Sequence, residues 1–176
     1  MIESPVVFNK ILPDDKFDAV ASLFEDFGEW RLSNVSDAEK GGYTSWELNE
    51  TTVVRPSNLI YYDVASYIKL IIKKFIRHDI ECIRLHTNGQ TFGQGSEFHK
   101  DFDSDEYYTF LLFTSPNWDV QWGGEFVCRN EDNFWAIPYQ SNGGVLFKSN
   151  WDHYGQSPNI LTDRIRTSLA YSYKEV

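Results

Sequence analysis

The sequence predicts a mainly β protein, either a sandwich or a jelly roll, with two helices at its N-terminal end. Two observations predict this class. Apolar residues recur at helical spacing before residue 76, whereas from Ile80 onward they alternate with a period of two. Clusters of turn-forming residues then divide the second part of the chain into short segments. Periodicity alone leaves the choice between a jelly roll and another sandwich open.

The N-terminal part is expected to contribute two helices. The first starts at Pro13-Asp14-Asp15 and stops at Gly28, because proline and acidic residues favour a helix N-terminus and glycine favours its end. The second follows a cap at residues 55–58 and buries one apolar face. That face comprises Ile60, Val64, Ile68, Ile71, Ile72 and Phe75. Between the helices, residues 45–48 alternate and predict a short strand.

The remainder of the chain is expected to form eight strands. Turn formers such as Asn88-Gly89 and Asn142-Gly143-Gly144 separate them. The expected strands are residues 81–87, 97–101, 107–114, 124–129, 134–137, 144–148, 153–157 and 167–173. We therefore expect one domain over residues 1–176, with a helical support over about 1–79 and a β core over about 80–176.

Composition excludes several classes of protein. The formal net charge of −10 disfavours a nucleic-acid partner, because Lys and Arg contacts to phosphates supply most of that affinity. No apolar run approaches the roughly 20 residues that span a bilayer, and the N-terminus has no signal-peptide pattern. We therefore expect a soluble cytoplasmic protein with no membrane partner. The two cysteines, Cys82 and Cys128, lie in apolar segments and are expected to be buried, reduced thiols.

The segment Glu97-Phe98-His99-Lys100-Asp101 carries the first chemical signal. In a strand, residues i and i+2 point to the same face, so His99 and Asp101 would project together. A third ligand from a distant strand would complete a two-His, one-carboxylate metal site with open positions, which is typical of non-haem iron oxygenases. Taken alone, the HxD pattern favours a surface histidine beside an acidic loop.

Three further features favour the metal site. His153 follows the apolar strand 144–148, where a distal ligand is expected. Arg166 enters an alternating strand, and a buried arginine is best paired with a carboxylate held through two hydrogen bonds. A salt bridge within the protein is the alternative interpretation of Arg166. The glycine pair Gly123-Gly124 opens a strand midway between the ligands.

The order of these motifs resembles the 2-oxoglutarate oxygenase superfamily, and within it the prolyl 4-hydroxylase-like branch. The similarity covers roughly residues 80–173 and includes Asn117-Trp118-Asp119 before the glycine pair and the segment from Gln156 to Pro158. The resemblance implies a double-stranded β-helix, or jelly-roll, core. Phe113 stands near the position where hypoxia-type relatives place a tyrosine that bonds 2-oxoglutarate.

The resemblance also implies the cofactors and the reaction. Fe(II) would be held by His99, Asp101 and His153, and the distal carboxylate of 2-oxoglutarate by Arg166 with the hydroxyl of Ser168. With dioxygen as the other reactant, the enzyme would be a dioxygenase that hydroxylates a C–H bond, and no catalytic side chain is expected beyond the metal centre.

The substrate implied by the resemblance is a prolyl residue of a peptide or protein. Trp122, Trp151 and Tyr154 lie next to motif residues and are candidates for an aromatic groove that binds such a segment. Ordinary packing is their alternative role. Two other functions stay open: a hydroxylase of a free amino acid or small metabolite, and a non-catalytic cupin-like binding module. His86 is interpreted as a structural residue.

Overall fold

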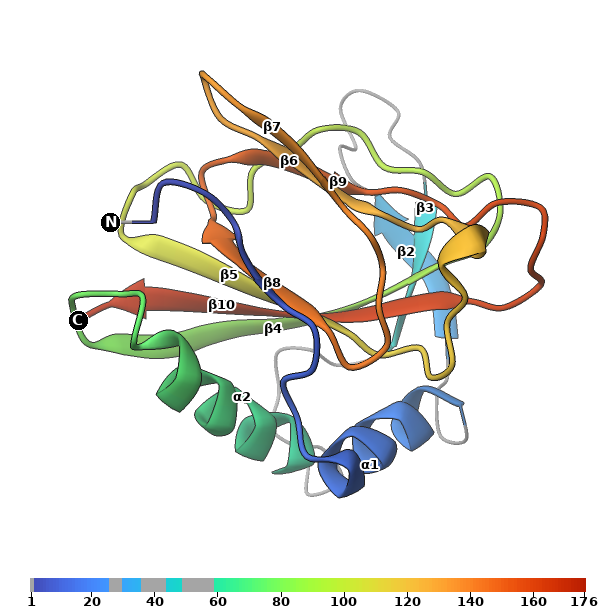
Figure 1. Ribbon diagram of the computed structural model, residues 1–176, viewed down its shortest axis with the longest axis horizontal. Helices are drawn as coiled ribbons and strands as arrows, with labels where there is room; N and C mark the ends of the chain where they lie inside the picture. The colour runs from blue at the N-terminus through green and yellow to red at the C-terminus, as the bar shows by residue number, and fades with distance from the viewer. Residues whose placement is uncertain (1, 26–29, 36–43, 49–58) are drawn as a thin grey trace.

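The computed structural model describes residues 2–25, 30–35, 44–48 and 59–176. Within them, two α-helices and ten strands form three layers (Figure 1). The helices are α1 (Asp14–Glu25) and α2 (Leu59–Ile72), and a 3-10 turn, η2, spans Val120–Trp122. The strands are β1 (Val6–Phe8), β2 (Trp30–Val35), β3 (Thr44–Leu48), β4 (Ile80–Gln90), β5 (Tyr107–Phe113), β6 (Phe126–Arg129), β7 (Phe134–Ile137), β8 (Gly144–Lys148), β9 (Asp152–Gly155) and β10 (Arg166–Glu175).

The layers are two antiparallel sheets and a pair of helices. The larger sheet has the order β1-β8-β5-β10-β4-β3-β2, and the smaller has the order β7-β6-β9. Figure 1 shows α1 and α2 against one face of the larger sheet and the smaller sheet over its opposite face. The prediction of a mainly β protein with N-terminal helices is confirmed. No helix in the described part of the chain is long and apolar enough to cross a membrane.

Strict alternation along the central strands builds two cores. On β5, Phe110 and Leu112 pack with the helices, whereas Leu111 and Phe113 pack with the smaller sheet. The same alternation on β10 places Leu169, Tyr171 and Tyr173 in the helical core. Because successive strand residues point to opposite faces, Arg166 and Ser168 face the smaller sheet instead. The central sheet is therefore buried on both faces.

The N-terminal third contributes more strand than the sequence indicated. β1 pairs with β8, and β2 and β3 extend the other edge of the larger sheet. Only β3 was expected. A three-residue strand such as Val6–Phe8 is too short to display a period, so the pattern could not indicate it. The expected stop at Gly28 and the cap at 55–58 lie outside the described residues.

Three local expectations were wrong. Asn88-Gly89 lies inside β4 rather than in a turn, and Gly89 is there because a Cβ would come within 2.7 Å of the Trp30 ring. Phe75 lies beyond the end of α2 and is 41% exposed. Residues 97–101 form no strand. Of these residues, only His99 pairs with β9, through a bridge to His153. The Asp101 backbone N–H donates instead to the Ser149 carbonyl, which lies outside β9.

The two cysteines are free thiols, Cys128 buried and Cys82 half-buried. Burial raises the pKa of Cys82 to about 11 and the pKa of Cys128 to about 12. Both thiols are therefore protonated at neutral pH, as expected for structural cysteines.

Candidate metal and anion site

A cavity of about 280 Å³ lies between the two sheets. Its walls come from β4, β5, β8 and β10 of the larger sheet, from β6 and β9 of the smaller sheet, and from the segment around His99. Polar and charged side chains supply most of the lining. A cavity in which several polar side chains converge beside an apolar core is a candidate ligand site.

His99, Asp101 and His153 meet at one end of this cavity. Their ligand atoms all lie within 4.8 Å of one another, and no other such group of three occurs among the described residues. The backbone explains the convergence, because His99 and His153 pair through N–H···O bonds of 3.1 and 2.9 Å. The structure thus brings together the three residues that the sequence indicated, although through a single bridge rather than a strand.

Both histidines are oriented by the same local device. Nδ1 of His99 lies 3.0 Å from the Glu97 carbonyl oxygen, and Nδ1 of His153 lies 2.9 Å from the Trp151 carbonyl oxygen. A carbonyl only accepts, so each Nδ1 carries a proton, and Nε2 is the ring nitrogen that is left for a metal ion. Nε2 of His153 lies 3.7 Å from Asp101 Oδ2. The two Nε2 atoms and the carboxylate are therefore the donor atoms available to a metal ion at this point.

The Asp101 carboxylate is fixed by a second layer of polar groups. Thr109 Oγ1 donates to Asp101 Oδ2 at 2.7 Å and lies 2.9 Å from Ser149 Oγ. Burial alone would raise the pKa of Asp101, but His153, Thr109 and Arg84 together hold it below its ordinary value. Burial lowers the pKa of His153 despite the nearby Asp101. Both directions favour the ionised carboxylate and the neutral imidazole, which are the forms that bind a metal ion.

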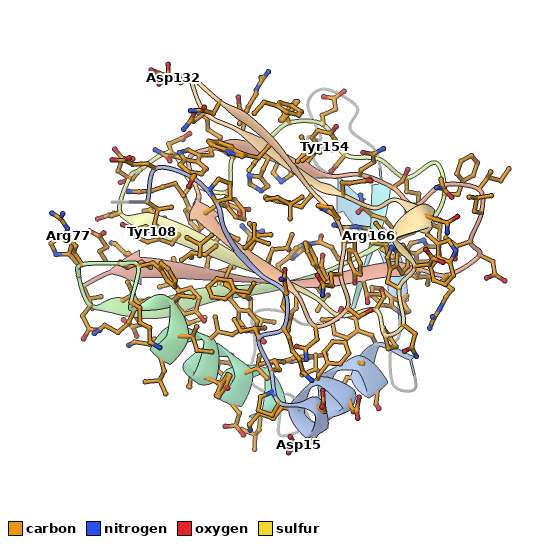
Figure 2. All side chains as sticks on the ribbon, viewed as in Figure 1. Asp15, Arg77, Tyr108, Asp132, Tyr154 and Arg166 are labelled. Atoms are coloured by element: carbon orange, nitrogen blue, oxygen red, sulfur yellow. The ribbon has the colours of Figure 1, made fainter. Side chains whose placement is uncertain are left out.

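Arg166 lies in the same cavity and is only 2% exposed. Figure 2 shows it between the two sheets. Nε donates to the Gly124 carbonyl at 2.7 Å, and Nη1 donates to Gln90 Oε1 at 3.0 Å. Nη2 is buried and has no hydrogen-bond partner among the residues that the structure describes. Burial lowers the pKa of Arg166 to about 10, and its polar partners are neutral. A buried guanidinium in this state lacks an anion.

Two glycines make room for this guanidinium. Gly124 has φ +86°, and a Cβ there would lie 3.0 Å from Arg166 Cδ. At Gly155 a Cβ would lie 2.9 Å from Gln90 Oε1 and 3.2 Å from Arg166 Nη1. Gly124 and Gly155 therefore leave room for Arg166, whereas Gly123 lies against Glu125 and Asn159. The strand that was expected to open at Gly124 begins later, at Phe126.

Sequence reasoning missed the polar face of β4. Alternate residues of β4 line the cavity, and they are Arg84, His86, Asn88 and Gln90. They oppose the cavity-facing residues of β10, which are Ser172, Ala170, Ser168 and Arg166. The i, i+2 spacing was visible, but Asn88-Gly89 was interpreted as a turn that ended the strand. His86, interpreted as structural, lies on this face.

The comparisons with known proteins give the fold a name. No family model matches the sequence, and no curated protein matches it. A prolyl hydroxylase from Trichoplax adhaerens, in complex with a hypoxia inducible factor peptide fragment, is similar over 97% of this chain and 83% of its own, with a TM-score of 0.75 at 16% identity. A prolyl-4-hydroxylase from Pseudomonas putida is similar over 98% and 92%, with a TM-score of 0.70 at 16% identity. HygX from Streptomyces hygroscopicus, with nickel, 2-oxoglutarate and hygromycin B bound, gives a TM-score of 0.71 at 8% identity over 98% and 83%.

The chain has the 2-oxoglutarate oxygenase fold. The expected jelly-roll core is confirmed. Within this fold, the three candidate metal ligands and Arg166 line one cavity between the sheets.

The aromatic candidates for substrate binding are not brought together in this fold. Trp122 packs edge-on against Trp118, and Trp151 stacks on Trp135 at 5.4 Å. Tyr154 contacts Phe98 edge-on at 4.8 Å, on the outer part of the smaller sheet (Figure 2). None of the three is among the described residues that line the cavity. Trp151 lines a separate groove that shares Lys100 with the cavity.

Proposed function

We propose that this chain is an Fe(II)- and 2-oxoglutarate-dependent dioxygenase that hydroxylates a C–H bond. The observation that carries the proposal is the buried, unpartnered Nη2 of Arg166 in the same cavity as His99, Asp101 and His153. A set of three metal-ligand side chains alone would fit many functions. The same set in one cavity with a buried guanidinium that has no anionic partner fits a cofactor that binds metal at one end and carries a carboxylate at the other.

His99, Asp101 and His153 would hold the iron. Two imidazole nitrogens and one carboxylate form the donor set that non-haem iron takes while keeping open positions. The carbonyl bonds to Nδ1 of both histidines fix the rings before metal binds, so little orientational freedom is lost on binding.

Arg166 and Ser168 would hold the distal carboxylate of 2-oxoglutarate. Nη2 of Arg166 supplies an unused donor, and the buried Ser168 lies two residues along β10 on the same cavity face. Gln90 is a neutral partner, so it orients the guanidinium without neutralising it. Arginine with a carboxylate is the strongest polar pairing open to such a site.

When bound, iron and 2-oxoglutarate supply an oxidation in which 2-oxoglutarate and dioxygen yield succinate, carbon dioxide and a hydroxylated substrate. The residues of the chain position the groups and exclude water. Phe126, Phe147 and Leu111 are buried and give the cavity an apolar wall, and the first two pack against the His153 ring. Thr109 holds the carboxylate of Asp101 in one orientation.

The finer proposal concerns the substrate. Hydroxylation of a prolyl residue is supported by the similarity of the fold to prolyl hydroxylases. A free amino acid or other small molecule is supported by the cavity volume of about 280 Å³ and by the position of Trp122, Trp151 and Tyr154 outside it. A cupin-like binding module would not explain why Arg166 Nη2 is buried without a hydrogen-bond partner.

An anaerobic titration tests the proposal. Fe(II) and then 2-oxoglutarate are added, and the weak visible metal-to-ligand charge-transfer band is followed in the wild type, His99→Ala and Arg166→Ala. We expect the band in the wild type, its loss in His99→Ala, and a requirement for more 2-oxoglutarate in Arg166→Ala. A wild-type protein that binds metal without developing the band would refute the proposal and favour the binding module.

A further inference from the structure

Arg84 lies at the end of the cavity opposite Arg166. Along the paired strands β4 and β10, Gln90 faces Arg166 and Arg84 faces Ser172. Six residues separate Arg166 from Ser172, which corresponds to about 20 Å at the usual rise of a strand. Arg84 and Arg166 both line the cavity, and Asp101 lies within ion-pair distance of Arg84. The cavity thus has a cation at each end.

The charges around the cavity do not balance. Its lining contains three cationic side chains, Arg84, Lys100 and Arg166, while Asp101 is the single acid among its described lining residues. This excess is local, because the whole chain carries −10. The proposed Fe(II) and 2-oxoglutarate carry opposite double charges and leave the excess unchanged. Charges of one sign in a cleft attract a ligand of the other sign.

Lys100 is a weaker candidate than Arg84 for binding an anion in the cavity. Lys100 also lines the neighbouring groove, where Asp105 and Asp152 are present. Arg84 has one ionic neighbour in the described chain, Asp101, with Nη1 and Oδ1 3.7 Å apart. That separation is too long for a hydrogen bond, and the guanidinium of Arg84 makes none with the described residues. The Arg84 side chain is 41% exposed, so its donors are accessible to a ligand, and Asp101 Oδ2 already accepts from Thr109.

We propose that Arg84 binds an anionic group of the substrate, a carboxylate. The inference rests on the proposed oxygenase function and names the class of its substrate. The carboxylate belongs either to a small acid, such as a free amino acid, or to an acidic residue of a peptide. Both sources share the same chemistry, a planar anion that a guanidinium binds through two hydrogen bonds.

A purely structural role for Arg84 makes a different prediction. If Arg84 only oriented Asp101, its loss would weaken iron binding and leave the choice of substrate unchanged. If Arg84 binds the substrate, its loss raises the KM for the substrate, while iron and 2-oxoglutarate still give their charge-transfer band. Arg77 is the matched control, because it is an exposed arginine in the turn after α2, far from Arg166 (Figure 2).

The experiment measures succinate formation by the protein loaded with Fe(II) and 2-oxoglutarate. The first pair of probes is a mixture of the L-amino acids against a mixture of their carboxamides. The second pair is a set of end-blocked proline peptides with Glu beside the proline against the same peptides with Gln. Wild type, Arg84→Gln and Arg77→Gln are compared, each after its charge-transfer band has been recorded.

We expect one acidic probe to stimulate wild type and Arg77→Gln at least about tenfold more than its neutral counterpart. In Arg84→Gln the KM for that probe should rise about tenfold to a hundredfold with the band retained. The pair that responds identifies the source of the carboxylate. Equal stimulation by neutral probes, an unchanged KM in Arg84→Gln, or loss of its band would overturn the inference.

If none of the probes stimulates succinate formation, a direct binding measurement decides the question. Acetate is titrated into the loaded protein while the NMR signal of the labelled Arg84 guanidinium, assigned through Arg84→Gln, is followed. A saturable shift supports an anion site at Arg84, and an unshifted signal overturns it. Failure of the oxygenase proposal itself is distinguishable, because the wild-type protein would then lack the charge-transfer band before any probe is added.

Discussion

Gly124 and Arg166 are in contact at a point where a larger residue would not fit. Arg166 Nε donates to the Gly124 carbonyl at 2.7 Å, and a Cβ on Gly124 would lie 3.0 Å from Arg166 Cδ. The left-handed φ of +86° at Gly124 turns that carbonyl toward the guanidinium. The glycine therefore sets the direction in which Nη2 points.

Gly124→Ala should weaken 2-oxoglutarate binding while iron binding is retained. The new methyl group would push the Arg166 side chain away from its bond to residue 124. Gly93→Ala is the control, because Gly93 has a similar φ of +82° but a Cβ added there would meet nothing within 4 Å. Titration of the charge-transfer band with 2-oxoglutarate should show at least about a tenfold weakening in the first variant alone. Equal effects in both would mean that backbone strain, rather than contact with Arg166, is responsible.

Arg166→Met should abolish most 2-oxoglutarate affinity without destabilising the protein. The substitution removes a buried cation that has only neutral hydrogen-bond partners and replaces it with an apolar chain of similar length. Such replacements are often neutral or stabilising. We expect a Tm equal to or above that of the wild type without cofactor, and no rise in Tm on adding 2-oxoglutarate. A large fall in Tm would show that Arg166 supports the fold.

The affinity for 2-oxoglutarate should depend on pH through Arg166. Burial lowers the pKa of Arg166 to about 10, and only the protonated form pairs with a carboxylate. The Kd should therefore be constant between about pH 7 and 9 and rise about tenfold per unit above pH 10. Calorimetry at several pH values measures it, with Arg166→Met as the variant that should lose the dependence. A wild-type Kd that stays flat through pH 11 would contradict the assignment.

Thr109→Val should weaken iron binding about tenfold or more, because it removes the hydroxyl that donates to Asp101. Valine keeps the shape of threonine, so the packing is preserved. Thr114→Val is the control, since Thr114 is equally buried but bonds to Thr167. An Fe(II) titration under nitrogen compares them. If both variants bind iron like the wild type, the bond to Asp101 has no part in metal affinity.

The residue pattern predicted the convergence of His99, Asp101 and His153 better than it predicted the side chains around them. An HxD pattern and a distant histidine are visible because each ligand type has few substitutes. Thr109 was not visible, since a threonine in a strand is ordinary and its bond to Asp101 depends on the folded arrangement. Gln90 was missed because Gly89 beside it was interpreted as a turn.

Gly89 and Gly124 show in another way what the sequence alone cannot indicate. Glycine serves turns, close contacts and left-handed backbone alike, and the sequence does not say which. Gly89 admits the Trp30 ring, while Gly124 admits Arg166. Both reasons depend on partners 42 or more residues away in the chain (Arg166 and Trp30), so only the fold reveals them.

The two faces of β4 and β10 have different roles, because one packs in the core and the other lines the cavity. One face holds Leu85, Leu169 and Tyr171 in the helical core, where change would unfold the protein. The other presents alternate residues to the cavity, where change would alter what is bound. A library restricted to Arg84, His86 and Ser172 could therefore explore new substrates on an intact scaffold. Selection acting on such a chain could retain its architecture while exchanging its chemistry one alternate residue at a time.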